Sequence, residues 1–548
     1  MSGKMVNLDA LIKRRNMDTG GDLEITSKTT EIKHTDLEEG AITYSVLCKP
    51  DFQRETASWT PEKVCDLVIT YAKDFVPAII VWRSASNDLF VIDGAHRLSS
   101  IIAWVNDDYG DGQISRAFFG DEISEDQKVA AQKTRDLINK SIGPYKSISN
   151  AFKSQPQYVE TAKALNFCSL TAQQLKTRDI HQAERSFFKI NEQGVSLSDT
   201  EIILLRSREC PNAIAARAIN QAGTGHRHWC KFAEENKDKI EKLGAELYTH
   251  CFKPPIAGPT IKTSVLPICG RHSSSSTLEM LLNLVNMTNK VAVDSSKHKA
   301  PLEELIEKDV DGERTIEFLK NTRRTIISIS NQPTSDYMKS LDLHPLIYFY
   351  SSNGRHLPSA FLATIEFIME YMEKDKFKEF TRIREKFEDF LTEYNDFFSQ
   401  IVLKTRGKMK AVHKIRDYFR LVAKECERGE NAEAVVKSLQ SSAEFKFLKL
   451  AAPLEGDEIS TDFTPPVKSK VFLRKKLETA IRCGICRARV PDQGVSVDHD
   501  VDKKLGGKGS EENARLTHHY CNSAKDILVP YLKAERKGVE ASGANTHS

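Results

Sequence analysis

The chain has 548 residues, 40% hydrophobic and 28% charged, with a formal net charge of +3. This length exceeds a single hydrophobic core, so roughly two to four domains are expected. The composition is that of a soluble globular protein. No apolar run is long enough to span a bilayer, and the first residues lack the apolar stretch of a signal peptide, so we expect a cytoplasmic protein without a membrane partner.

Residues 1–240 combine short strand-like runs with helical patterns, which predicts an α/β domain. The apolar runs at 75–82 and 89–92 are expected to be strands, the second ending in a turn at Asp93-Gly94. Residues 60–75 are expected to form a helix, because Thr60 and Pro61 supply an N-cap and a first-turn residue ahead of a one-sided apolar pattern.

Residues 241–450 are helical in pattern, with large apolar side chains recurring every three or four positions from Phe380 to Phe397. This stripe is expected to be the core of a helical domain; an aromatic stacking platform for bases is the alternative. Residues 451–467 contain acids, Gly456 and Pro465-Pro466, which indicates a linker.

The last region contains three of the eleven cysteines. Cys483 and Cys486 form one Cys-x-x-Cys pair, and His518 and Cys521 form a second pair with the same gap. Two such pairs are what a tetrahedral structural Zn²⁺ needs. His519 is the alternative to His518, and a redox role for the first pair is the alternative to zinc. The other eight cysteines are scattered, as expected of inert thiols in a reducing compartment.

Between the two pairs lie residues that suit phosphodiester hydrolysis. A short strand is expected to end at Asp498-His499, a "KKLGGKG" turn follows, and Asn522 lies at the start of a helix. A carboxylate and an amide oxygen suit Mg²⁺ or Mn²⁺, and a neutral histidine beside the cation can accept a proton from water. Between positions 466 and 490, eight basic residues face one acid, which favours a polyanionic substrate.

At these positions the chain resembles the zinc-knuckle branch of the HNH endonuclease family, whose pattern C-x-x-C…DH…N…[CH]-x-x-C-N-x-x-K it follows from Cys483 to Lys525. The resemblance implies a ββα-metal fold with His499 as general base. It implies that Asp498 and Asn522 bind the catalytic metal, that Asn513 fixes the histidine loop, and that Lys525 lies near phosphate. An inactive zinc knuckle that only binds DNA is the alternative.

Residues 92–100 read IDGAHRLSS. The tight turn at Gly94 places Arg97 where a helix begins, and such a helix N-terminus suits a phosphate, to which His96 and Arg97 add donors. Alone the motif is weak, because an ordinary turn with a surface arginine looks the same. The chain has no P-loop motif.

Two further segments make this motif more specific: Phe52-Gln53-Arg54 with Trp59 precedes it, and Ile190-Asn191, Gly194, Leu197-Ser198 and Glu201 follow it. Together they resemble the ParB-related domain at the N-terminus of GmrSD and SspE restriction proteins, which binds nucleoside triphosphates and can hydrolyse them. Ala95 stands where that family has glutamine, so binding is expected more than hydrolysis. The resemblance implies a phosphate pocket formed by Gln53, Arg54, Asp93, Gly94, His96, Arg97 and Asn191.

The fold expected is an α+β multidomain protein: a ParB-like α/β domain (1–240), a helical domain (241–450), a linker (451–467) and an HNH domain (468–548). The expected function is a type IV-like, modification-dependent antiphage DNA endonuclease, regulated by nucleotide or DNA sensing at its N-terminus. A ParB-like nucleotide-switch regulator that binds DNA without cutting is the alternative, and a homing endonuclease is a third. The sequence leaves homo-oligomerisation open.

Overall fold

The structure is a computed structural model, and it divides into two compact units. Unit 1 comprises residues 1–245, 273–285 and 292–319, and unit 2 comprises residues 246–272, 286–291 and 320–548. The structure describes residues 5–15, 17, 29–53, 55–120, 123–177, 179–193, 199–224, 228–256, 260–272, 274–291, 306–330, 339–405, 408–450 and 462–544.

Unit 1 contains a six-stranded mixed sheet in the order β1-β3-β5-β4-β6-β2. The pairs β1/β3, β3/β5 and β4/β6 are parallel, whereas β4/β5 and β2/β6 are antiparallel. The expected strands are present, although the run at 75–82 enters the sheet only at Ile79, after its proline. The strands are β1 (Lys13–Arg15), β2 (Thr30–Ile32), β3 (Leu47–Pro50), β4 (Ile79–Arg83), β5 (Leu89–Asp93) and β6 (Leu170–Gln174).

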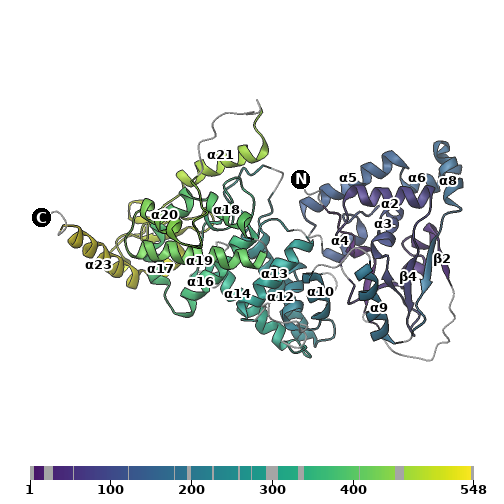
Figure 1. Ribbon diagram of the computed structural model, residues 1–548, viewed down its shortest axis with the longest axis horizontal. Helices are drawn as coiled ribbons and strands as arrows, with labels where there is room; N and C mark the ends of the chain where they lie inside the picture. The colour runs from purple at the N-terminus through teal and green to yellow at the C-terminus, as the bar shows by residue number, and fades with distance from the viewer. Residues whose placement is uncertain are drawn as a thin grey trace. The chain divides into compact units, whose positions relative to one another are not determined.

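Both faces of this sheet are buried, which explains the continuous apolar run of β5. Val91 packs on one face with helices α2 and α3, while Phe90 and Ile92 pack on the other with Phe187 of α9. The helices of this region are drawn in purple and blue in Figure 1. They are α1 (Ile42–Val46), α2 (Pro61–Lys73), α3 (Ala95–Asn106), α4 (Gln113–Phe119), α5 (Glu125–Ser141), α6 (Tyr145–Ser149), α7 (Ala151–Ser154), α8 (Val159–Leu165), α9 (Ile180–Gln193), α10 (Asp199–Arg206) and α11 (Pro211–Asn220).

Unit 2 is mostly helical. Phe380, Phe387 and Phe390 of the predicted aromatic stripe are buried, and the Phe387 ring stacks on that of Phe367, so the core interpretation is confirmed. Three helices cross the division between the units: α12 (Glu234–Phe252), α13 (Ser274–Thr288) and α14 (Glu313–Ile329). Those wholly within unit 2 are α15 (Pro345–Tyr348), α16 (Pro358–Glu373), α17 (Phe377–Glu393), α18 (Asp396–Lys404), α19 (Lys408–Glu427), α20 (Ala432–Ser441), α21 (Pro465–Glu478), α22 (His519–Ser523) and α23 (Lys525–Ala544).

The C-terminal part of unit 2 carries a two-stranded antiparallel sheet of β7 (Ser496–His499) and β8 (Ala514–Thr517). Of the expected linker, residues 451–461 lie outside the described residues, and Pro465-Pro466 open helix α21 rather than ending a linker. None of the helices within the described ranges is both long and apolar enough to cross a lipid bilayer.

Candidate metal centre and nuclease site

The first cysteine pair lies on a tight turn between α21 and β7. The amide of Cys483 donates to the carbonyl of Ala488 at 3.0 Å, and the amide of Arg487 donates to the carbonyl of Cys483 at 2.9 Å. Arg487 adopts φ 67°, a left-handed conformation that closes the turn. The amide of Gly484 donates to the carbonyl of Leu516 at 2.9 Å, which fastens the turn to β8.

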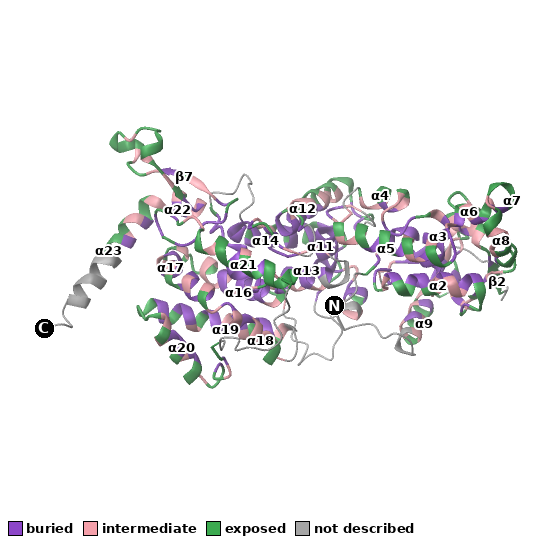
Figure 2. Cartoon of the chain, turned by 90° about the horizontal axis from the view of Figure 1, so that it is seen from above, coloured by how far each residue is buried: buried purple, intermediate pink, exposed green. Residues whose placement is uncertain are grey.

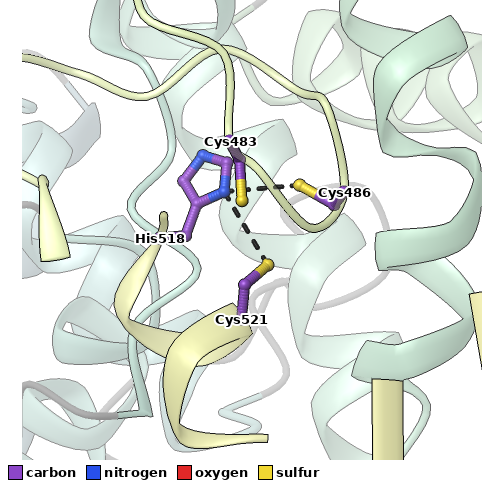
Figure 3. A group of neighbouring side chains, drawn as sticks. All are labelled: Cys483, Cys486, His518 and Cys521. Carbon is purple, nitrogen blue, oxygen red and sulfur yellow. Dashed lines mark hydrogen bonds between the residues drawn. The ribbon is translucent and has the colours of Figure 1, made fainter. Parts of the chain in front are cut away.

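The second pair completes a four-residue cluster at the start of α22. The ligand atoms of Cys483, Cys486, His518 and Cys521 all lie within 4.8 Å of one another, and all four residues are buried. Figure 3 shows Nδ1 of His518 facing the sulfurs of Cys486 and Cys521, at 3.4 and 3.8 Å.

These separations fit a tetrahedral metal, since ligands bound to zinc at ~2.3 Å (sulfur) and ~2.0 Å (nitrogen) lie about 3.6 Å apart. Nε2 of His518 lies 3.0 Å from the carbonyl of Arg489, to which it donates, so the lone pair of Nδ1 faces the sulfurs. Hydrogen bonds among the thiols lower the pKa of Cys483 but raise that of Cys521. The cluster could therefore hold a metal ion, and its donor set suits structural zinc.

His519 does not join this cluster. Its backbone N–H donates to Oδ2 of Asp342 at 2.7 Å, and its Nδ1 lies 3.0 Å from the same oxygen. Asp342 is fully buried. Because Asp342 precedes α15 and His519 begins α22, this contact ties the helical part of unit 2 to the helix that carries Cys521.

A second tie comes from α17. Arg384 and Glu388 form a buried ion pair at 2.6 Å, and Arg384 also donates to the carbonyl of Asp342 at 3.1 Å. Oε2 of Glu388 accepts the backbone N–H of Arg489 at 3.0 Å. Since the carbonyl of Arg489 accepts from His518, the helical core supports the cluster through one intervening residue.

The β7–β8 hairpin carries one predicted metal ligand, Asp498, and the predicted general base, His499. Asp498 and His499 are the last two residues of β7 and pair with Arg515 and Ala514 of β8. Asp498 is buried, whereas His499 is half-buried beside the exposed 500–513 loop. Figure 2 shows that loop in green beyond the end of β7.

Asn513 closes this loop with its side chain. Its amide oxygen accepts the N–H of Val501 at 2.7 Å, while its amide nitrogen donates to the carbonyls of Val501 and Lys508 at 3.1 and 2.8 Å. A Cβ on Gly507 would lie 1.8 Å from the carbonyl oxygen of Val501. Gly507 is therefore needed for close backbone approach, a feature that the turn prediction alone does not contain.

Asn522 is fastened to the same strand. Its amide nitrogen donates to Oγ of Ser496 at 2.8 Å and to the carbonyl of Val497 at 3.3 Å. The structure thus brings Asp498, His499 and Asn522 to one strand, with Asn513 at the base of the loop that follows it.

The carboxylate of Asp498 is held by two cations. Oδ2 accepts from Nε and Nη2 of Arg515 at 3.1 and 2.8 Å, and Oδ1 accepts from Nζ of Lys525 at 2.7 Å. Burial opposes ionisation, but the hydrogen bonds from Lys525 and Arg515 lower the pKa of Asp498. Sequence reasoning missed Arg515; its position opposite Asp498 in the hairpin register is the signal that could have found it.

The N-terminal motif residues lie around the end of β5. Asp93 and Arg97 form an ion pair at 2.5 Å across the first turn of α3. Gly94 adopts φ 89°, and a Cβ there would lie 2.4 Å from Cγ2 of Ile79. Gln53 is buried, and its amide nitrogen donates to the carbonyls of Val91 and Ile92 at 3.1 and 3.3 Å.

His96 lies apart from the ion pair. Its Nε2 is 2.8 Å from Oγ of Ser58, and its ring stacks on that of Trp59 at 5.3 Å. Arg54 lies outside the described residues, as do Gly194, Leu197 and Ser198. Asn191 lies in α9, but its side chain is outside what the structure describes, as is that of Glu201. The structure therefore groups Gln53, Asp93, Gly94 and Arg97 around β5. It places His96 beside Ser58 instead and does not test the positions of the Arg54 and Asn191 side chains.

Comparison with known proteins adds one match. Residues 37–206 match the model of a protein family described as GmrSD restriction endonuclease, N-terminal domain; this segment contains strands β3 to β6. No curated protein and no solved structure matches the chain. The N-terminal part of the chain is thus similar to the N-terminal domain of GmrSD restriction endonucleases.

Proposed function

We propose that this chain is an antiphage, modification-dependent DNA endonuclease whose C-terminal HNH module hydrolyses phosphodiester bonds. The observation that carries the proposal is the grouping on β7: Asp498 and His499 end the strand, and Asn522 is hydrogen-bonded to it. The N-terminal family match supports a restriction role independently.

His499 is the proposed general base. Its ring is half-buried next to an exposed loop, where both water and a DNA backbone can reach it. A neutral imidazole accepts a proton from the attacking water and contributes roughly 10²–10⁴-fold to the rate. The hydrogen bonds of Asn513 hold the loop that follows the histidine and so limit its motion.

Asp498 and Asn522 are the proposed ligands of a divalent cation. Their oxygens are hard donors that suit Mg²⁺ or Mn²⁺, and Oδ1 of Asp498 already accepts from a cationic group, Nζ of Lys525. When bound, such a cation stabilises the charge that develops on the phosphate and the leaving oxygen. Asp502 lies 3.1 Å from Lys525 and would keep that lysine beside the site if Oδ1 bound a metal instead.

The test is cleavage of plasmid DNA with and without Mg²⁺. We expect Mg²⁺-dependent cutting by the parent chain and a loss of at least about 100-fold in His499→Ala. His413→Ala is the matched control, because His413 is an exposed histidine on α19. If His499→Ala cuts as fast as the parent, the catalytic assignment is wrong and the alternative, a regulator that binds DNA without cutting, takes its place.

The N-terminal unit is the proposed sensor, with a nucleoside triphosphate held at the start of α3. Arg97→Ala should weaken triphosphate binding in calorimetry and leave the zinc content unchanged. Arg83→Ala is the control: it removes an exposed arginine from β4 and should not weaken triphosphate binding. Unchanged affinity in Arg97→Ala removes this pocket from the proposal. Digestion of modified and unmodified phage DNAs, with and without each triphosphate, identifies the DNA modification and the direction of control.

A further inference from the structure

Helix α21 has an anchored face and a basic face. Ser469 and Leu473 are buried one turn apart. The hydroxyl of Ser469 accepts the backbone N–H of Ile261 at 3.0 Å and donates to the carbonyl of Pro465 at 2.9 Å. The bond to Ile261 holds one side of the helix against the rest of unit 2, just ahead of the metal cluster that begins at Cys483.

The rest of the helix surface is exposed and positively charged. Lys468 and Lys475 are seven positions apart and so share one line along the helix, while Lys470 and Arg474, four apart, share another. Arg474 and Lys475 expose 73% and 74% of their side chains. At 100° per residue, Val467 and Val471, both exposed, lie between the two lines. Two basic rows therefore flank a low apolar ridge.

These charges are poorly neutralised by the protein. Glu478 is the helix's one acid; it lies 3.1 Å from Lys475 and 3.9 Å from Arg474. Within the described ranges Lys468, Lys470 and Lys476 form no ion pair. Lys468 lies in the first turn, which contains no acid and where the helix dipole disfavours a positive charge. A purely solvated helix gains nothing from this placement.

We propose that α21 is a DNA-docking element, in which its two basic rows contact phosphates on either side of a groove and hold the duplex for the hairpin that carries His499. This inference rests on the proposed function, which supplies DNA as the partner. Contacts of this kind position a duplex without reading its sequence, so α21 contributes affinity and register rather than specificity.

The test measures duplex binding without Mg²⁺, so that cleavage plays no part. A variant with Lys468, Lys470, Arg474 and Lys475 all changed to Gln should bind a non-cognate duplex about ten-fold or more weakly. The negative slope of log K against log salt should become shallower by about 3 to 4, because each phosphate contact contributes about −0.9 to it. The control changes four exposed lysines elsewhere in unit 2 to Gln: Lys424, Lys437, Lys446 and Lys449.

The outcomes separate this proposal from the catalytic one. An unchanged salt slope in the α21 variant, or an equal fall in the control, overturns the docking role while leaving His499-dependent cleavage untouched. Conversely, if His499→Ala does not change cleavage, the binding measurements on the α21 variant still test the docking role. A parent chain that binds no duplex DNA overturns both, and preferential binding of single-stranded RNA overturns the assigned partner.

Discussion

Arg515 directs two hydrogen bonds, of 3.1 and 2.8 Å, to a single oxygen of Asp498. The other oxygen of that carboxylate is left to Lys525. Because Asp498 and Arg515 face each other across the β7–β8 ladder, the strand pairing itself sets this arrangement. Arg515 is therefore a positioning residue that fixes the carboxylate rotamer and presents one oxygen to a cation.

Replacing Arg515 should weaken the metal site without removing a ligand. In Arg515→Gln we expect the Mg²⁺ concentration for half-maximal cleavage to rise by about 10- to 100-fold, the usual effect of losing a residue that orients a metal ligand. Arg515→Lys should recover only part of this, since an ammonium lacks the planar two-donor geometry. A Mg²⁺ titration of initial cleavage rates measures the change.

Lys533→Gln is the control for that titration, because it removes an exposed positive charge from α23. A lower maximal rate at an unchanged Mg²⁺ requirement in Arg515→Gln would show that the arginine acts on DNA instead of Asp498.

The Asp342 carboxylate should contribute about 1–3 kcal/mol of stability, because its loss leaves the N–H of the half-buried His519 without this acceptor. We expect Asp342→Ala to lower the thermal unfolding midpoint and to reduce zinc retention and cleavage together. Asp342→Asn keeps an acceptor oxygen and should be milder. Circular dichroism and zinc analysis of the same samples provide the readout.

Backbone strain needs its own control here, since Asp342 has φ 47°. Asp375 has φ 51° but is exposed, so Asp375→Ala incurs the same conformational cost without losing a buried contact. Equal midpoint shifts in the two variants would mean that the bond to His519 contributes nothing.

Sequence reasoning works for the metal cluster because its chemistry is local. Each pair of ligands lies within one short turn, so the x-x gap alone predicts that both side chains face the same way. The two pairs then need only one hairpin to meet, and the strand ending at Asp498-His499 could be recognised from its own residues. Helix α2 is predictable for the same reason, since Thr60 accepts the N–H of Lys63 as an N-cap.

The support around the cluster was not predictable, because it comes from distant segments. Asp342 and His519 are 177 positions apart, and Glu388 and Arg489 are 101 apart, with no periodic pattern to connect them. Helix α21 is not predicted for another reason: its buried side has only Ser469 and Leu473, too few for an apolar pattern. The Pro465-Pro466 pair indicates a break in the pattern, but proline is also favoured in a first helical turn.

Metal removal should expose three thiols at once. Cys483, Cys486 and Cys521 are buried in the cluster, whereas Cys230 is exposed. Without a chelator, Cys230 should react with a thiol reagent while the three cluster cysteines stay protected. After strong chelation, one equivalent of zinc should be released and three further thiols should react. Three cluster thiols that react freely before chelation would contradict a bound structural metal.

The second glycine of the loop provides the most local test of catalytic geometry. In Gly507→Ala the new Cβ would lie 1.8 Å from the carbonyl oxygen of Val501 and 2.9 Å from Nδ2 of Asn513, so the loop after His499 must shift. We expect cleavage to fall by about ten-fold or more, since small misplacements of a reacting group are costly, while zinc content stays normal. Gly506→Ala is the adjacent control: its Cβ meets nothing within 4 Å, although φ is +87°. Initial cleavage rates at saturating Mg²⁺ measure both variants, and equal losses would assign the effect to backbone strain in the turn rather than to the closure that Asn513 makes.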